Sequence, residues 1–278
     1  MTLPNFLGIG AMRSGTTWLD KILRSHPDIY LPERRKEVHF FDQYYERGIN
    51  WYQAFFPSSA QAYTYQNIGE ITPKYLYAPQ VPNRIREHLP NCRFIVILRN
   101  PADRAYSQYG FSVKNFDESR TFQEYFNQES EVFMRGLYSQ QFKRYLQYFP
   151  LEKFLILIYE HTVNYPEQAL NQLANFLGID ANKFDRNILK QRANPSRKVR
   201  FSRARALAIR FGAFLQSKDL DWLWNIAKNS GMRRIFEQGD ALPSINPSVR
   251  TELISKYELD ITLLEDLIGM DLSVWRKG

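Results

Sequence analysis

The chain has 278 residues, 44% of them hydrophobic, and a net charge of +8 from 37 basic and 29 acidic side chains. This length is enough for one large α/β domain or at most two small ones, and we predict a single domain over residues 1–278. The single cysteine, Cys92, excludes an internal disulfide and suits a reducing compartment. No apolar run approaches the roughly eighteen residues of a membrane span, and the N-terminus lacks the pattern of a signal peptide. We therefore expect a cytoplasmic protein.

Three short apolar runs predict buried strands, and each is followed by a segment with helical periodicity. The runs are Asn5–Gly10, Cys92–Leu98 and Lys153–Tyr159. The predicted helices cover Thr17–Ser25, Asp103–Val113, Lys143–Phe149, Pro166–Leu177 and Ser248–Ile268, with Gly178 as the C-cap of the fourth. Continuous apolar strands that alternate with helices indicate an α/β fold, with a parallel sheet covered by helices on both faces.

The turn between the first strand and the first helix has the spacing of a phosphate-binding loop. In Gly10–Thr17, four residues separate two glycines, so backbone N–H groups and the N-terminus of the following helix converge on one point. A loop that handles a triphosphate carries lysine directly after the second glycine, whereas this chain has Thr16 there. Its cation is Arg13, inside the loop. The loop therefore predicts a site for a phosphate or a phosphosulfate.

A second anion-binding motif follows the strand that ends at Leu98. Arg99 stands at the carboxyl end of that strand, where open α/β sheets bind their ligands. Ser107 lies about one turn into the next helix and is able to face the same side. An arginine together with a hydroxyl suits a terminal phosphate, although Arg99 could equally cap a surface loop.

With these motifs in order, the chain resembles the sulfotransferase family that uses 3′-phosphoadenosine 5′-phosphosulfate (PAPS), especially its carbohydrate and heparan-sulfate branch and bacterial relatives. The matching segments, which run over essentially the full length, are Arg13–Thr17, Arg99–Ser107, Gly136–Gln141, Phe176–Gly178 and Tyr257–Glu265, with Trp275 near the end. The resemblance implies a P-loop-type sheet and transfer of a sulfonate group to a hydroxyl or amine, with release of adenosine 3′,5′-bisphosphate (PAP).

The resemblance also assigns residues to the nucleotide. Arg13, Ser14, Gly15, Thr16 and Thr17 correspond to the phosphosulfate loop, with Arg13 also counted as catalytic. In a separate assignment, the 3′-phosphate goes to four side chains, those of Arg99, Ser107, Arg197 and Lys198. The last two lie in a basic region with no acidic residue between Asp185 and Asp219, which is either an anion site or a solvated face. Arg200, in the same region, is left open as the alternative to them. No metal site is expected.

The base that takes the acceptor proton is sought in the segment Lys36–Asp42. It resembles the heparan-type segment in which a glutamate is the base, which favours Glu37, with His39 as the alternative. If the segment is extended, Glu37, His39 and Phe41 face one way. The chain departs from the heparan-type pattern at Ile71, where that branch has lysine, and Lys74 is a nearby substitute.

Two other functions compete with sulfonate transfer. A P-loop nucleoside or small-molecule kinase would bind ATP with magnesium, and the absence of lysine at position 16 weighs against it. A nucleic-acid-binding protein would explain the positive charge, but no recognised nucleic-acid module is present, and we expect no such partner. The acceptor could be a carbohydrate, a lipid, a polyketide-type hydroxyl or a small alcohol, and the oligomeric state is left open.

Overall fold

The computed structural model describes residues 2–128, 130–190, 202–223 and 243–276. The chain divides into two compact units. The first unit comprises residues 1–100, 137–192 and 254–278, and the second comprises residues 101–136 and 193–253. The single domain expected over the whole length stays a prediction.

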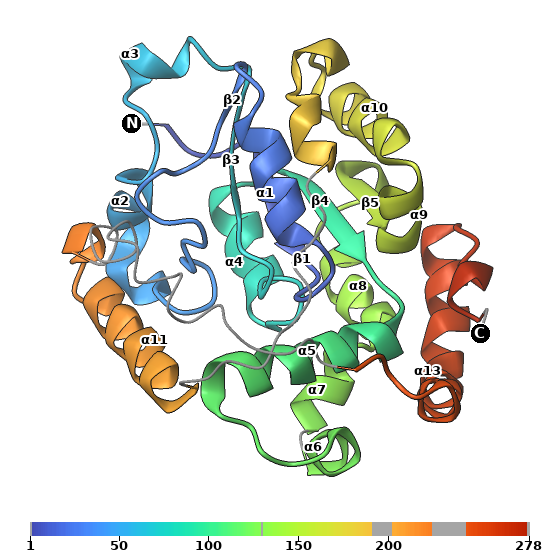
Figure 1. Ribbon diagram of the computed structural model, residues 1–278. Helices are drawn as coiled ribbons and strands as arrows, with labels where there is room; N and C mark the ends of the chain where they lie inside the picture. The colour runs from blue at the N-terminus through green and yellow to red at the C-terminus, as the bar shows by residue number, and fades with distance from the viewer. Residues whose placement is uncertain (1, 129, 191–201, 224–242, 277–278) are drawn as a thin grey trace. The chain divides into compact units, whose positions relative to one another are not determined.

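The first unit is built on a parallel sheet of five strands in the order β2–β3–β1–β4–β5 (Figure 1). The strands are β1 (Phe6–Gly10), β2 (Ile29–Tyr30), β3 (Asn67–Ile71), β4 (Arg93–Leu98) and β5 (Phe154–Ile158). Every residue of β1 is buried, and its neighbours β3 and β4 lie on opposite sides of it. The strand order therefore reverses direction at β1. In open α/β sheets, ligands bind at the carboxyl end of the strands where this reversal occurs.

Helices of the same unit cover both faces of this sheet. On one face, Ile95 and Ile97 pack with apolar side chains of α1 (Thr16–Arg24) and α10 (Pro166–Leu177). On the other face, Phe94 contacts Tyr145 of α8 (Tyr138–Leu146), with ring centroids 5.6 Å apart. Successive side chains of a strand point to opposite faces, so β4 contributes apolar side chains to the core on both sides of the sheet.

Shorter elements and one long helix complete the first unit. They are η1 (Tyr45–Arg47), α2 (Gly48–Gln53), α3 (Ser59–Ala62), α4 (Val81–His88), η2 (Leu151–Lys153), α9 (Tyr159–Asn164), η3 (Ala181–Lys183), η4 (Arg186–Lys190) and η6 (Ser273–Trp275). The long helix α13 (Pro247–Ile268) begins in the second unit, and its residues from 254 onward belong to the first.

The second unit is helical. It contains α5 (Pro101–Phe116), α6 (Phe122–Gln128), α7 (Ser130–Met134) and α11 (Ser202–Ser217). Two polar contacts tie α5 to other helices of this unit: Arg250 pairs with Asp103 at 3.0 Å, and Arg205 donates to Asn115 at 2.8 Å. Among the residues that the structure describes, no helix is long and apolar enough to cross a bilayer.

The fold class predicted from the sequence is confirmed, and the three predicted strands are observed within one residue at each end. The helix Pro166–Leu177 is confirmed, and Gly178 ends it with φ +72°. The helix expected at Lys143–Phe149 was misplaced, because α8 begins five residues earlier, at Tyr138. Strand β3 was not predicted.

Candidate functional site

The anion-binding loop lies at the carboxyl end of β1 and leads directly into α1. Gly15 is the N-cap of α1 and has φ +95°, a conformation that a residue with a Cβ rarely adopts. The first N–H groups of α1, at Thr16 and Thr17, have no partner within the helix by the geometry of helix ends. The loop therefore directs N–H dipoles and the positive end of a helix dipole toward one place.

Ser14 supplies the clearest sign that the loop is built to receive a ligand. Its side chain is fully buried, and its hydroxyl has no hydrogen-bond partner in the structure. An unsatisfied buried hydroxyl costs about 1–3 kcal/mol, so such groups are uncommon unless a ligand or an ion uses them. A phosphate or sulfonate oxygen bound in the loop would satisfy it.

Arg99 lies against the loop, which a single anion site formed by both of them requires. Its guanidinium donates to the backbone carbonyl of Arg13 at 3.4 Å and lies over the ring of Tyr159, 4.7 Å from the centroid. The same ring faces Gly15, where an added Cβ would come within 3.0 Å of it. One tyrosine thus packs against both halves of the candidate nucleotide site.

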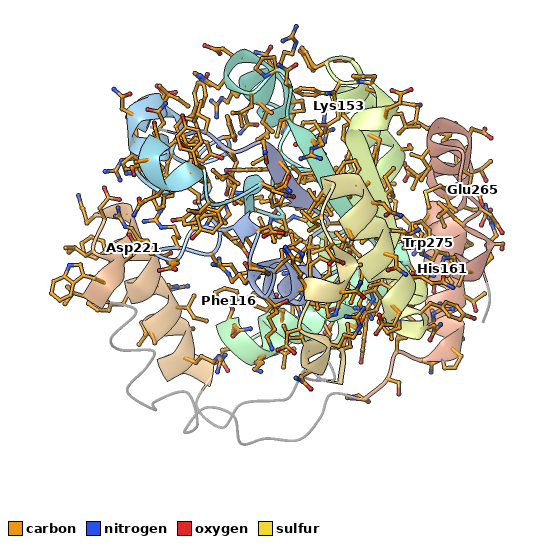
Figure 2. The ribbon with its side chains drawn as sticks, turned by 90° about the horizontal axis from the view of Figure 1, so that it is seen from above. Phe116, Lys153, His161, Asp221, Glu265 and Trp275 are labelled. Atoms are coloured by element: carbon orange, nitrogen blue, oxygen red, sulfur yellow. The ribbon has the colours of Figure 1, made fainter. Side chains whose placement is uncertain are left out.

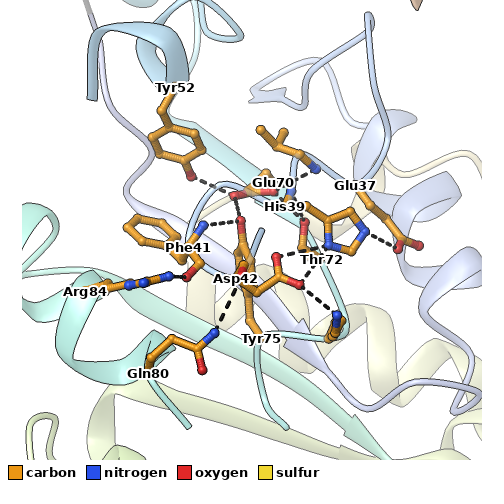
Figure 3. A network of polar contacts seen from close by, with 12 residues as sticks. Glu37, His39, Phe41, Asp42, Tyr52, Glu70, Thr72, Tyr75, Gln80 and Arg84 are labelled. Atoms are coloured by element: carbon orange, nitrogen blue, oxygen red, sulfur yellow. Dashed lines mark hydrogen bonds and ion pairs between the residues drawn. The ribbon is translucent and has the colours of Figure 1, made fainter. Parts of the chain in front are cut away.

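The segment that carries the candidate bases crosses to the same loop. Lys36 Nζ donates to Thr17 Oγ1 at 3.3 Å and lies 3.8 Å from a carboxylate oxygen of Glu37 (Figure 3 shows the surrounding network). Glu37 Oε2 is in turn 3.4 Å from His39 Nε2. The two candidate bases are therefore in direct contact with each other.

The segment is not extended throughout, however. His39 has φ +59°, and its carbonyl accepts from the N–H groups of Gln43 and Tyr44, so a turn begins there. The alternation breaks at this turn, and Phe40 and Phe41 are both fully buried. The predicted orientation of Phe41 beside His39 was wrong for this reason.

A second carboxylate orients the imidazole of His39. Nδ1 lies 3.1 Å from Asp42 Oδ1, and the Asp42 side chain is only 1% exposed. Lys74 Nζ is 3.6 Å from Asp42 Oδ2, which places the lysine expected as a substitute within the same network, whereas Ile71 is buried in the core. The order Glu37–His39–Asp42–Lys74 alternates acid and cation.

These contacts decide the protonation states of the two candidate bases. Burial alone lowers the pKa of His39, but the hydrogen bonds to Asp42 and Glu37 outweigh it and raise the pKa to about 9. Burial alone raises the pKa of Glu37, but its bond with His39 and the charges of Lys36 and Arg13 hold the pKa below its ordinary value. At neutral pH the pair is a carboxylate and an imidazolium, so the proton acceptor of the pair is Glu37.

A buried carboxylate fixes the backbone of this segment to β3. Glu70 Oε2 accepts from the N–H of Val38 at 3.3 Å and from the Thr72 hydroxyl at 2.7 Å. Oε1 accepts from the hydroxyls of Tyr52 at 2.8 Å and Tyr75 at 2.9 Å (Figure 3). Glu70 thus accepts four hydrogen bonds. One of the donors, the N–H of Val38, belongs to the candidate base segment, so Glu70 ties that segment to β3.

Three of the predicted site residues are not placed by these contacts. Ser107 lies half-buried on α5, in the second unit. Arg197 and Lys198 lie outside the described residues. Sequence reasoning in turn missed Tyr159, Glu70 and the role of Asp42. Only the position of Tyr159, at the end of an apolar strand, gave a signal that could have found it.

A parallel sheet with a glycine-containing loop at the end of its central strand, joined by a second arginine, is the arrangement typical of α/β proteins that bind phosphate groups. The family model described as "Sulfotransferase domain" matches residues 3–216. The chain therefore belongs to the sulfotransferase family, as its motifs suggested, and the kinase alternative is not favoured.

Individual relatives agree with this family. A membrane-associated sulfotransferase of Dictyostelium discoideum, kil1, is 41% identical over 114 residues, which are 41% of this chain and 24% of the relative. Human heparan sulfate glucosamine 3-O-sulfotransferase 6 is 32% identical over 184 residues, covering 63% of this chain and 52% of the relative. The matched regions thus span from about a quarter to half of these relatives.

The fold has a counterpart of the same extent among solved structures. A sulfotransferase from Alicyclobacillus acidocaldarius superposes with a TM-score of 0.69 at 25% sequence identity, and the match covers 100% of both chains. The α/β architecture described above is therefore similar to that of a solved sulfotransferase.

Proposed function

We propose that this protein transfers a sulfonate group from PAPS to a hydroxyl or amine acceptor and releases PAP. The observation that carries the proposal is the contact of the Arg99 guanidinium with the phosphate-type loop at Arg13. One guanidinium from the residue after β4 and one from the loop then serve the two phosphorylated ends of a single nucleotide. Family membership supports the reaction class, because sulfotransferases use PAPS as the donor.

The donor fits the loop by charge and by hydrogen bonding. The 5′-phosphosulfate is proposed to take the N–H groups of Gly15–Thr17 and the free hydroxyl of Ser14. Arg13 and Lys36 would neutralise the charge that builds on the bridging oxygen as the bond to sulfur breaks. Arg99 would hold the 3′-phosphate.

Glu37 is proposed as the general base. Its side chain is 37% exposed, so an acceptor is able to reach it. As the acceptor oxygen or nitrogen bonds to sulfur, Glu37 takes its proton and the S–O bond to the 5′-phosphate of PAP breaks. His39 keeps its own proton, because the neighbouring carboxylates raise its pKa, and it orients Glu37.

Three further assignments rest on family resemblance. Ser107 and the basic residues Arg197 and Lys198 are proposed to complete the binding of the 3′-phosphate. The acceptor is proposed to be a carbohydrate, a lipid or a polyketide-type alcohol, and two of the relatives bear on the choice, since one is named as a heparan sulfate sulfotransferase and another as membrane-associated. The charged groups around Glu37 support a polar acceptor.

Thermal-shift titration with PAP against ATP tests the donor site. We expect PAP to raise the melting temperature in the micromolar range without magnesium, and ATP to have little effect at the same concentration. A larger shift by ATP with magnesium would favour a kinase and contradict the proposal. Mass spectrometry of acceptor mixtures incubated with isotopically labelled PAPS would then identify the acceptor class.

A further inference from the structure

The C-terminal tryptophan is joined to the strand end that carries Arg99. Trp275 is fully buried, and its indole N–H donates to Glu160 Oε2 at 2.9 Å. Asn100, the residue after Arg99, donates its side-chain amide to the Trp275 carbonyl at 2.7 Å. Figure 2 labels Trp275 and also His161, the residue that follows Glu160 in the chain. The proposed function gives this tryptophan no role.

Glu160 closes the connection through the backbone. Its Oε1 accepts the backbone N–H of Asn100 at 2.9 Å. The register explains the contact: Leu98 of β4 pairs with Ile158 of β5, so the residues that follow each strand run side by side. One carboxylate thus bridges the N–H of Asn100 and the indole N–H of Trp275, and Asn100 itself is fully buried.

The backbone of Arg99 itself is held as well. Its backbone carbonyl accepts the hydroxyl of Tyr138 at 3.0 Å. The carbonyl of Arg99 and the N–H of Asn100, which are the two polar groups of one peptide unit, therefore both have set directions. The guanidinium itself is held more loosely, by a 3.4 Å hydrogen bond and by the ring of Tyr159. The direction of the side chain then depends on how firmly its backbone is held.

We infer that Glu160, with Trp275 as its buried partner, is a positioning residue that aims Arg99 at the 3′-phosphate of the donor. The inference rests on the proposed function, since it assumes that Arg99 binds that phosphate. Glu160 acts through the backbone of Asn100 and does not touch the nucleotide. Its contribution should therefore be felt by a ligand that carries a 3′-phosphate and not by one that lacks it.

The test compares the dissociation constants of PAP and of adenosine 5′-phosphate by isothermal titration calorimetry. For Glu160→Gln we expect PAP binding to weaken about fivefold, the equivalent of one hydrogen bond of about 1 kcal/mol. Adenosine 5′-phosphate should change less than twofold. Trp275→Phe removes the indole N–H and keeps an aromatic ring, and it should shift PAP binding in the same direction by about two- to threefold.

The matched control is Glu265→Gln. Glu265 accepts from the N–H of Leu272 and from Arg276, so this variant loosens the same C-terminal segment without touching Asn100. We expect it to lower thermal stability and to leave the ratio of the two dissociation constants unchanged. Equal weakening of both nucleotides by Glu160→Gln, or an equal effect of the control on the ratio, overturns the inference.

The double variant Arg99→Ala, Glu160→Gln separates failure of this inference from failure of the proposed function. If Glu160 acts through Arg99, then adding Glu160→Gln to Arg99→Ala causes little further loss of PAP binding. Fully additive losses overturn the positioning role alone. If Arg99→Ala by itself leaves the ratio of the two nucleotides unchanged, the proposed donor site is wrong and the positioning role falls with it.

Discussion

The imidazole of His39 joins the carboxylate of Glu37 at 3.4 Å while its other nitrogen lies 3.1 Å from Asp42. A histidine between two carboxylates is stabilised as the cation, and a carboxylate beside a cation is stabilised as the anion. We therefore propose different roles for the two candidate bases: Glu37 accepts the proton, and His39 holds Glu37 in place.

The first prediction concerns Glu37. The change Glu37→Gln should lower kcat about a hundredfold or more, because an amide does not take a proton in the transition state. The dissociation constant of PAP, measured by calorimetry, should stay within about twofold, since the loop and Arg99 are untouched. Turnover near that of the wild type would remove Glu37 from the role of base.

The second prediction concerns pH. The pKa of His39 is raised to about 9 from an ordinary value of 6.5, so the folded state gains stability from protonation. That stability is fully present below about pH 6.5 and is lost as the pH rises through about 9. Urea unfolding between pH 6 and 10 should show this loss, and His39→Gln should reduce it. An NMR titration that finds His39 neutral at pH 7 would contradict the raised pKa.

The third prediction concerns the 3′-phosphate. Arg99→Ala should weaken PAP binding by about 1.5–3 kcal/mol, the range for a hydrogen bond to a charged group. Binding of adenosine 5′-phosphate should change little. The control is Lys153→Ala, which removes one positive charge at the amino end of β5, the opposite end of the parallel sheet. If Lys153→Ala weakens PAP binding as much as Arg99→Ala does, the loss of affinity comes from the change in net charge alone.

The fourth prediction uses two glycines with similar backbones. Gly15 has φ +95° and a Cβ there would lie 3.0 Å from the ring of Tyr159, whereas Gly178 has φ +72° and open space around it. Both alanine variants should lose about 1–2 kcal/mol of unfolding free energy from backbone strain. Gly15→Ala alone should also weaken PAP binding, because the ring of Tyr159 must move. Equal PAP affinity in the two variants would show that the contact is unimportant.

The fifth prediction tests the anchor of the base segment. Four donors converge on the buried carboxylate of Glu70. Glu70→Gln replaces one of its two acceptor oxygens by an amide nitrogen, which does not accept hydrogen bonds, so two of the donors lose their partner. The free energy of unfolding should fall by about 1–3 kcal/mol. The exposed Glu46 supplies the control, and Glu46→Gln should change stability by less than about 0.5 kcal/mol. Urea denaturation of both variants measures the difference.

The sequence was most informative where a run of apolar residues forms a strand buried on both faces. Both β4 and β5 are of this kind, and the residues that follow them could be placed at the binding edge. Strand β3 escaped prediction because it carries Asn67, Gly69 and Glu70. Their polarity is compensated by partners far along the chain, such as the carbonyl of Leu177 for Asn67, and no local pattern reveals these.

The candidate site was predictable to a similar degree. The glycine spacing and Arg99 are local signals, and the geometry brings them together. The protonation of His39 was not predictable, because it depends on Asp42, which approaches only through the left-handed turn at His39 itself. The packing of Tyr159 between Gly15 and Arg99 likewise needs the strand register.

The contact between Arg99 and Arg13 spans 86 positions of the chain, and Tyr159 comes from later still. Parallel pairing between distant segments forms slowly, since loop closure precedes any gain from contacts. A partly folded chain with only the first strand and helix would lack the second guanidinium and the ring. The bisphosphorylated nucleotide should therefore bind late in refolding, and the moment of its capture would report when the sheet is complete.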